Sequence, residues 1–299
     1  MTGPRSRFRT FVGIALGGGR GKQTAVARLA WQPGAPAPDL AVTFAAARVG
    51  HRGTGEAGAE PASEAGYLRD PDLEAYLDLQ LADDPLVAVD APVTVPPCLR
   101  CRLSCPGIVA CPQPDTRLVA DLAPRRGSKP VFLPYAERAC EVVHRLDGSL
   151  VRAGFGQGTA PVAARVQYLL HRFAGRLVPQ VNLVEVAPRA ALVRWYGEAT
   201  ERATRVGAAR DVQRARAEVL EDLRGRLRFE RVWPELVVRQ RAVFYAVVAA
   251  VLASDLAREG WTYAQTVADP ELARVVDEHA DVFVRAGWIW LPPPGRPAA

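Results

Sequence analysis

Long apolar runs are missing from this chain of 299 residues, and we expect no secretion signal. Its longest apolar stretch, residues 242–253, is shorter than the roughly 20 residues that a membrane-spanning helix needs. The N-terminus carries basic residues but no uninterrupted apolar segment of the kind that directs secretion. We therefore expect a cytoplasmic protein with no membrane partner.

Lysine is also scarce. Lys22 and Lys129 are the only two, so arginine supplies nearly all the positive charge behind the net charge of +6. The segment 194–241 alone holds twelve arginines against eight acidic residues. Codon usage, solvated surface and helical salt bridges such as Asp222 with Arg226 account for part of this excess. The alternative interpretation is a surface that faces nucleic acid, because arginine binds phosphate well.

The remaining composition is that of an ordinary globular protein, with 49% hydrophobic and 23% charged residues. Short apolar or alternating runs predict strands at residues 11–17, 23–31, 40–49, 86–92 and 181–186, and a closing strand at 287–292. Apolar residues at helical spacing predict helices at residues 70–81, 135–147, 160–174, 209–227 and 237–258. The helix 237–258 is apolar nearly all round, so we expect it to pack inside the protein.

This order of elements predicts an α/β fold with a five-stranded mixed sheet and flanking helices. We expect one domain over residues 11–292, after a disordered N-terminus at 1–10 and before a disordered tail at 293–299. A long cysteine-rich loop, about residues 96–134, follows the fourth strand. The part from about 190 to 292 is largely helical.

Cysteine is uncommon, yet four of the five cysteines fall within fourteen residues. Cys98, Cys101, Cys105 and Cys111 have the spacing C-x₂-C-x₃-C-x₅-C. In a cytoplasmic chain such a cluster favours metal ligation over disulfides. Four thiolates packed in one loop favour a [4Fe–4S] cluster, and a zinc ion is the alternative. Cys140 stands apart and is interpreted as a buried apolar residue.

Arginines close to these cysteines are candidate substrate-binding residues. Arg100 and Arg102 lie between the cysteines, and Arg125 and Arg126 follow them. Because Cys98 comes soon after the predicted fourth strand, we expect the metal loop and its arginines beside the end of that strand. There the guanidinium groups could meet the phosphates of a substrate.

Five short motifs together resemble a known family. The chain is similar, over about residues 11–292, to the family of predicted RNase H-like nucleases called domain of unknown function 429. The motifs that carry the resemblance are Gly13-Ile-Ala15, Ala88-Val-Asp-Ala-Pro92, Glu185-Val-Ala-Pro188, Phe244-Tyr-Ala-Val-Val-Ala-Ala250 and Gly287-Trp-Ile-Trp-Leu-Pro292. The resemblance implies an RNase H-like fold, in agreement with the predicted order of elements.

The resemblance also implies metal-assisted phosphodiester hydrolysis, with Mg²⁺ held by carboxylates from the first, fourth and fifth strands and a late helix. Asp90 and Glu185 match two of these positions, whereas Ala15 and Tyr245 stand where the family pattern has aspartate. We expect Asp90 and Glu185 to face each other across a groove, with Ala15 and Tyr245 beside them. Losing half the carboxylates weakens such a magnesium site severely.

Three functions follow from these features. We favour a metal-containing RNase H-fold protein that binds nucleic acid or another partner after losing part of its catalytic set. The first alternative is an active Mg²⁺-dependent nuclease that uses Asp90 and Glu185. The second is an iron–sulfur redox or structural cluster protein whose cysteine loop is the working part.

Overall fold

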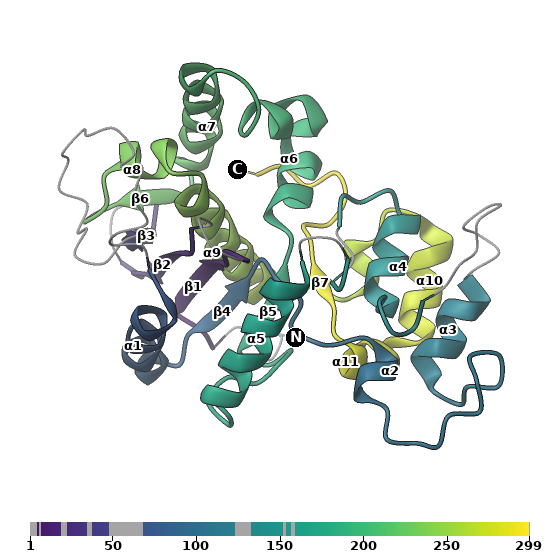
Figure 1. Ribbon diagram of the computed structural model, residues 1–299. Coiled ribbons are helices and arrows are strands. Elements are labelled where there is room, and N and C mark those ends of the chain that lie inside the picture. The colour runs from purple at the N-terminus through teal and green to yellow at the C-terminus, as the bar shows by residue number, and fades with distance from the viewer. Residues whose placement is uncertain are drawn as a thin grey trace.

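A computed structural model describes residues 5, 7–18, 23–34, 38–47, 68–122, 133–151, 154–156 and 159–298. Its centre is a mixed sheet of seven strands (Figure 1). The strands are β1 (Thr10–Ala15), β2 (Ala25–Trp31), β3 (Leu40–Ala46), β4 (Leu86–Val89), β5 (Leu183–Val186), β6 (Leu227–Phe229) and β7 (Ile289–Trp290). Their order in space is β6-β3-β2-β1-β4-β5-β7. Strand β2 is antiparallel to β1 and β3, whereas β4 is parallel to β1 and β5 is parallel to β4.

The α/β class is therefore confirmed, but the sheet has seven strands rather than the five predicted. The two additional strands extend its edges. β7 pairs with β5 in the segment where a closing strand is predicted, and β6 pairs with β3. Residue 227 was expected to end a helix, and β6 has only three residues there. So short a strand carries too little alternation to be distinguished from the end of a helix.

Helices surround the sheet and connect its parallel strands. They are α1 (Asp70–Gln80), η1 (Leu81–Asp83), α2 (Pro97–Arg100), α3 (Pro114–Leu122), α4 (Ala139–Leu146), α5 (Ala160–Arg172), α6 (Pro188–Ala203), α7 (Ala209–Leu223), α8 (Pro234–Arg239), α9 (Arg241–Glu259), η3 (Ala264–Thr266), α10 (Pro270–Glu278) and α11 (Ala280–Ala286). Each of the five predicted helices has a counterpart, and the last one divides into α8 and α9. Among the described residues no helix is both long and apolar enough to cross a membrane.

The two faces of the sheet are covered by different helices. On one face α1 and α5 bury apolar side chains such as Leu77 and Phe173 against β1 and β4. On the other face lies α9, which is buried over most of its length, as its apolar sequence predicts. The α9 helix can approach closely because Gly13 of β1 has no side chain. A Cβ atom there would lie 1.9 Å from the carbonyl oxygen of Ala246.

A group of smaller helices lies beyond β7, at the opposite edge of the sheet from β6 (Figure 1). It contains α2, α3, α4, α10 and α11, and the loop between α2 and α3 projects from it. The chain then returns to the other side of the molecule. There Ala298 is buried, and its carbonyl oxygen accepts a hydrogen bond from Arg226, in the segment expected to be a disordered tail.

Candidate functional site: an arginine-lined cleft at the strand ends

A cleft of about 710 Å³ opens where β1, β4 and β5 end. The carboxyl ends of parallel strands meet at one edge of a sheet, and ligands commonly bind there. Four positions that the family resemblance connects all line this cleft: Ala15, Asp90, Glu185 and Tyr245. The fold thus brings together residues that are far apart in the sequence.

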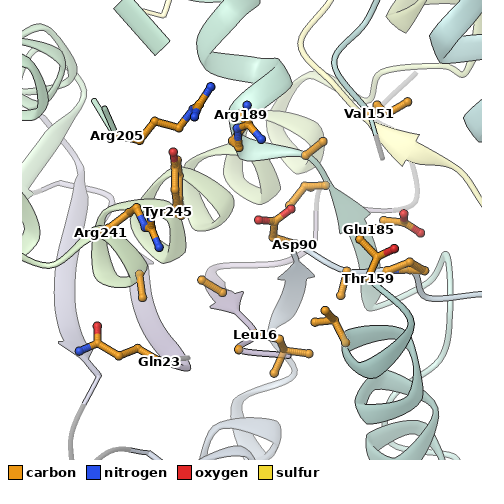
Figure 2. Close-up of a pocket in the computed structure, with 18 of the residues that line it drawn as sticks. Leu16, Gln23, Asp90, Val151, Thr159, Glu185, Arg189, Arg205, Arg241 and Tyr245 are labelled. Carbon is orange, nitrogen blue, oxygen red and sulfur yellow. The ribbon is translucent and has the colours of Figure 1, made fainter. Parts of the chain in front are cut away.

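The two carboxylates in the cleft point in different directions (Figure 2). Asp90 follows β4, its backbone N–H donates to the carbonyl oxygen of Ile14, and its side chain is directed toward the side of the cleft that holds Arg189 and Tyr245. The Glu185 carboxylate is directed away from that side. The expectation that Asp90 and Glu185 face each other is therefore wrong.

Glu185 is instead part of a buried ion-pair network. Both of its oxygens accept hydrogen bonds of 2.6 Å from the Arg138 guanidinium, and one also accepts the Val93 N–H at 3.0 Å. Arg138 also donates to Glu141, whose Oε1 accepts the Gly154 N–H at 2.7 Å. Burial raises the pKa of the Glu185 carboxyl, and the Arg138 guanidinium opposes this effect. Glu185 is committed to holding the structure together.

The position opposite Asp90 is occupied by the phenol of Tyr245, on the second turn of α9. Its side chain is 8% exposed, and burial raises the pKa of its hydroxyl. The nearby Thr204 hydroxyl donates to the carbonyl oxygen of Glu201 at 2.7 Å. The Tyr245 hydroxyl has no hydrogen bond of good geometry within the part of the chain that the structure describes.

Arginines dominate the rest of the cleft wall. Buried Arg216 donates to the carbonyl oxygens of Thr204 and Val238, whereas Arg239 and Arg241 are exposed. Neither exposed arginine forms an ion pair with an acidic side chain among the described residues. The full set of arginines in the wall is Arg189, Arg205, Arg216, Arg239 and Arg241. Four of them belong to the arginine-rich segment 194–241, which was the signal for this surface in the sequence.

The arginines proposed from the sequence lie elsewhere. Arg100 is paired with Asp115 and donates to the carbonyl oxygen of Arg285 at 3.3 Å, and Arg102 is exposed on the loop after α2. Neither residue lines the cleft. Arg125 and Arg126 lie outside the described residues. Closeness in sequence to β4 was misleading because the chain leaves the sheet edge after Pro97 and enters the group of small helices (Figure 1).

Cys98 lies in α2, and Cys101, Cys105 and Cys111 lie on the projecting loop that follows it, away from the cleft. Cys98 and Cys105 are exposed, and Cys101 accepts hydrogen bonds of 3.4 Å from the Leu103 N–H and the Gln113 amide. Burial and the like charges of Cys111, Cys105 and Cys101 raise the pKa of the Cys98 thiol. As the loop is placed, the described residues contain no group of three or more cysteine, histidine or acidic side chains able to hold a metal ion.

Searches of protein-family models, curated proteins and solved structures found no match for this chain.

Proposed function

We propose that this protein is an RNase H-like nucleic-acid-binding protein that has lost most of its capacity for Mg²⁺-dependent cleavage. Support for the fold comes from the strand order β3-β2-β1-β4-β5, with three antiparallel strands followed by two parallel to β1. This is the arrangement that the family resemblance implies. The cleft lies at the ends of the strands from which that resemblance draws its carboxylates.

The observation that carries the binding function is the charge of the cleft wall. Five arginines line it against two acidic residues. Glu185 is paired with Arg138, and Glu201 behind the wall is shared by Arg189 and Arg205. Arginine presents a planar set of donors that matches phosphate oxygens, and a concave cationic surface attracts polyanions. Nucleic acid is the polyanion that a former nuclease groove fits.

The same residues argue against efficient hydrolysis. A magnesium site needs several oxygen ligands that converge on the ion. Here Ala15 and Tyr245 supply no carboxylate, and both Glu185 oxygens are bound to a guanidinium. Asp90 is the one carboxylate of the four positions that is directed toward the arginine side of the cleft (Figure 2).

Binding is tested with single-stranded and double-stranded oligonucleotides over a series of salt concentrations. Affinity should fall steeply with salt because each arginine–phosphate contact releases a counterion. Replacing Arg239 and Arg241 together by glutamine should make the salt dependence shallower. Arg210→Gln, which removes an exposed arginine of α7 outside the cleft, is the matched control. Absence of binding at low salt would contradict the proposal.

Cleavage is tested by incubating the same oligonucleotides with Mg²⁺. We expect little or no cleavage by the wild type. The double variant Ala15→Asp with Tyr245→Asp should gain Mg²⁺ affinity, since it adds two carboxylates beside Asp90. Robust wild-type cleavage that Asp90→Asn abolishes would instead favour the active nuclease.

We further propose that the cysteine loop takes up a metal centre, either an iron–sulfur cluster or zinc, through Cys98, Cys101, Cys105 and Cys111. The spacing of four cysteines within fourteen residues and the N–H donors on Cys101 support it. Ligation would have to draw the thiols together, and metal binding supplies free energy for such ordering. The metal would then stabilise the loop rather than act in the cleft.

Metal analysis and an absorption spectrum of protein purified without oxygen test this second proposal. Each of the four Cys→Ser variants should contain less metal and melt at a lower temperature than the wild type. Cys140→Ser is the control because that thiol is buried in α4, outside the loop. Equal metal content in all four loop variants and the wild type would contradict the proposal.

A further inference from the structure

One end of the cleft contains a compact group of cationic and phenolic side chains: Arg189, Arg205, Arg241 and Tyr245 (Figure 2). They come from α6, the turn after it, and the first two turns of α9. We call this group the arginine–tyrosine subsite. Some hydrogen-bond donors of this group have no acceptor among the described residues. Neither the fold nor the proposed loss of cleavage explains why these donors are kept.

Two of its arginines are held in place from behind by one carboxylate. Glu201 is 2% exposed, and its Oε1 accepts a 2.7 Å hydrogen bond from Nε of Arg189 and a 2.8 Å bond from Nε of Arg205. Burial opposes ionisation of Glu201, but these two hydrogen bonds outweigh it and lower the pKa of the carboxyl. Because Nε makes the bond to Glu201 in each case, the terminal nitrogens of both arginines remain as donors toward the cleft.

Tyr245 provides an independent indication of a ligand. Its side chain is more than nine-tenths buried and lines the cleft. Its hydroxyl has no hydrogen bond of good geometry among the described residues, and the neighbouring Thr204 hydroxyl acts on it only as a weak donor that opposes the rise in its pKa. The hydroxyl is directed toward Arg205 (Figure 2). Buried hydroxyl groups usually have a partner, and leaving one unpaired costs free energy. A ligand oxygen held by the arginines would accept the hydrogen bond that the Tyr245 hydroxyl can donate.

The helices strengthen the preference for an anion. The first turns of α6 and α9 contribute Arg189 and Arg241 to this end of the cleft. The N-terminal ends of helices carry partial positive charge and unpaired N–H groups, both of which favour bound phosphate. Positive charge from side chains and from backbone therefore converges on the same space.

The free donors of the subsite narrow the kind of anion. Glu201 binds only Nε of Arg189 and of Arg205, and the second carboxylate nearby, Asp90, lies across the cleft, so three guanidinium groups still present terminal N–H donors. A phosphodiester inside a nucleic-acid chain carries one negative charge, whereas a phosphate monoester carries about −1.5 to −2 at neutral pH and offers three acceptor oxygens. A terminal phosphate monoester therefore matches the number of free donors better than a phosphodiester does.

We propose that the arginine–tyrosine subsite binds a terminal phosphate monoester, the phosphorylated end of the nucleic acid that occupies the cleft. This inference rests on the proposed binding function and specifies which part of the ligand the subsite takes. Arg189, Arg205 and Arg241 bind the phosphate oxygens, and Tyr245 donates its hydroxyl to one of them. The protein would then recognise the end of a nucleic-acid strand rather than its middle.

The test compares three probes in direct binding assays: a 5′-phosphorylated single-stranded DNA decamer, the same decamer with a 5′-hydroxyl, and adenosine 5′-monophosphate. A 3′-phosphorylated decamer shows whether the subsite accepts either end. We expect one of the phosphorylated decamers to bind at least about tenfold more tightly than the unphosphorylated one, since several charge-assisted hydrogen bonds are gained. Tyr245→Phe and Arg241→Gln should each remove most of that preference, whereas Arg210→Gln should retain it.

The outcomes separate this inference from the function it rests on. Equal affinity for all three decamers would overturn the subsite while nucleic-acid binding stands. Binding of the monophosphate, lost in Tyr245→Phe and Arg241→Gln, without binding of any decamer would support the subsite and overturn the nucleic-acid function. A preference for phosphorylated ends that survives both variants would place the phosphate elsewhere and overturn the assignment of these residues. Thermal unfolding of each variant shows that the fold is retained.

Discussion

Two clusters of arginine and glutamate lie near the end of β5, and they use the same residue types for opposite purposes. In the closed cluster Arg138 sits between Glu141 and Glu185, and all three side chains are buried. In the open cluster Arg189 and Arg205 share Glu201, with Arg241 and Tyr245 beside them in the cleft. The first cluster has two acids for one arginine, and the second has one acid for three arginines.

The two clusters show that the number of hydrogen bonds an arginine makes within the protein, and not its residue type, separates a structural arginine from one that can bind a ligand. Arg138 uses Nε, Nη1 and Nη2 in hydrogen bonds to the two glutamates, and Nη1 also donates to Thr94. It has little left for a ligand. Arg189 and Arg205 spend only Nε on Glu201 and keep donors in the cleft. Buried charges must be fully paired, whereas surplus donors at a cleft mark a place for an anion.

Breaking the closed cluster should have the largest effect. Arg138→Met keeps the length of the side chain but leaves Glu141 and Glu185 buried together without their counter-ion. Removing one partner of a buried pair typically costs about 3–5 kcal/mol of unfolding free energy. Urea unfolding measures this loss. Arg241→Met in the open cluster is the comparison and should change stability by less than about 0.5 kcal/mol. Similar losses in both variants would erase the distinction between the clusters.

A histidine of α4, the helix that begins directly after Arg138, makes the closed region sensitive to acid. His144 is fully buried, its Nε2 lies 2.8 Å from the carbonyl oxygen of Ile289, and its ring packs against Trp288. Burial, aided by the charge of Arg194, lowers its pKa from 6.5 to about 3. Between pH 6.5 and 3 the histidine binds a proton in the unfolded chain but not in the folded protein. Its contribution to the unfolding free energy is therefore complete above pH 6.5 and is lost as the pH falls toward 3.

The expected loss from this histidine is about 1.4 kcal/mol per pH unit within that window. His144→Gln, which retains an amide donor for Ile289, should therefore show a smaller decrease in unfolding free energy between pH 6.5 and 4.5 than the wild type. Chemical unfolding at several pH values measures both slopes. The same substitution at exposed His171 is the control. Parallel curves for wild type and His144→Gln would show that this histidine does not contribute.

The smallest effect belongs to the open cluster. Tyr245→Phe removes a buried hydroxyl that has no hydrogen bond of good geometry among the described residues, with Thr204 beside it as a weak donor. Its loss should leave the unfolding free energy unchanged or raise it by up to about 1 kcal/mol, since an unpaired buried polar group is unfavourable. Urea unfolding of the ligand-free protein tests this. A decrease of more than about 1 kcal/mol would show that the hydroxyl is satisfied inside the protein and has no need of a ligand.

Much of the fold could be predicted from the sequence because its periodicity is strong. The apolar runs of β4 and β5 and the all-round apolar α9 each predict a buried element, and these elements occur at the predicted places. The break between α8 and α9 at Gln240 was missed. No proline or glycine marks that break, so the local pattern gives no sign of it.

The site was only partly predictable for a different reason. Ala15, Asp90 and Tyr245 were assigned through the family resemblance, whose short motifs can be found in the local sequence, and all three line the cleft. The partner of Glu185 could not be assigned in this way, because Arg138 is 47 residues away and reaches it only through tertiary packing. The same limit explains why Arg100 was chosen over Arg189. Distance along the chain says little about which guanidinium groups face a cleft.

The contact between Gly13 and α9 has a consequence for how the cleft responds to an occupant. There the backbone of the strand meets the backbone of the helix at Ala246 and Ala250, with no side chain between them to change rotamer. Tyr245 and Arg241 therefore stand on a wall that does not yield. The opposite wall is α6, which is interrupted at Gly197, where φ is 83°. We therefore expect any closure of the cleft around a ligand to come from movement of α6, while α9 stays in place.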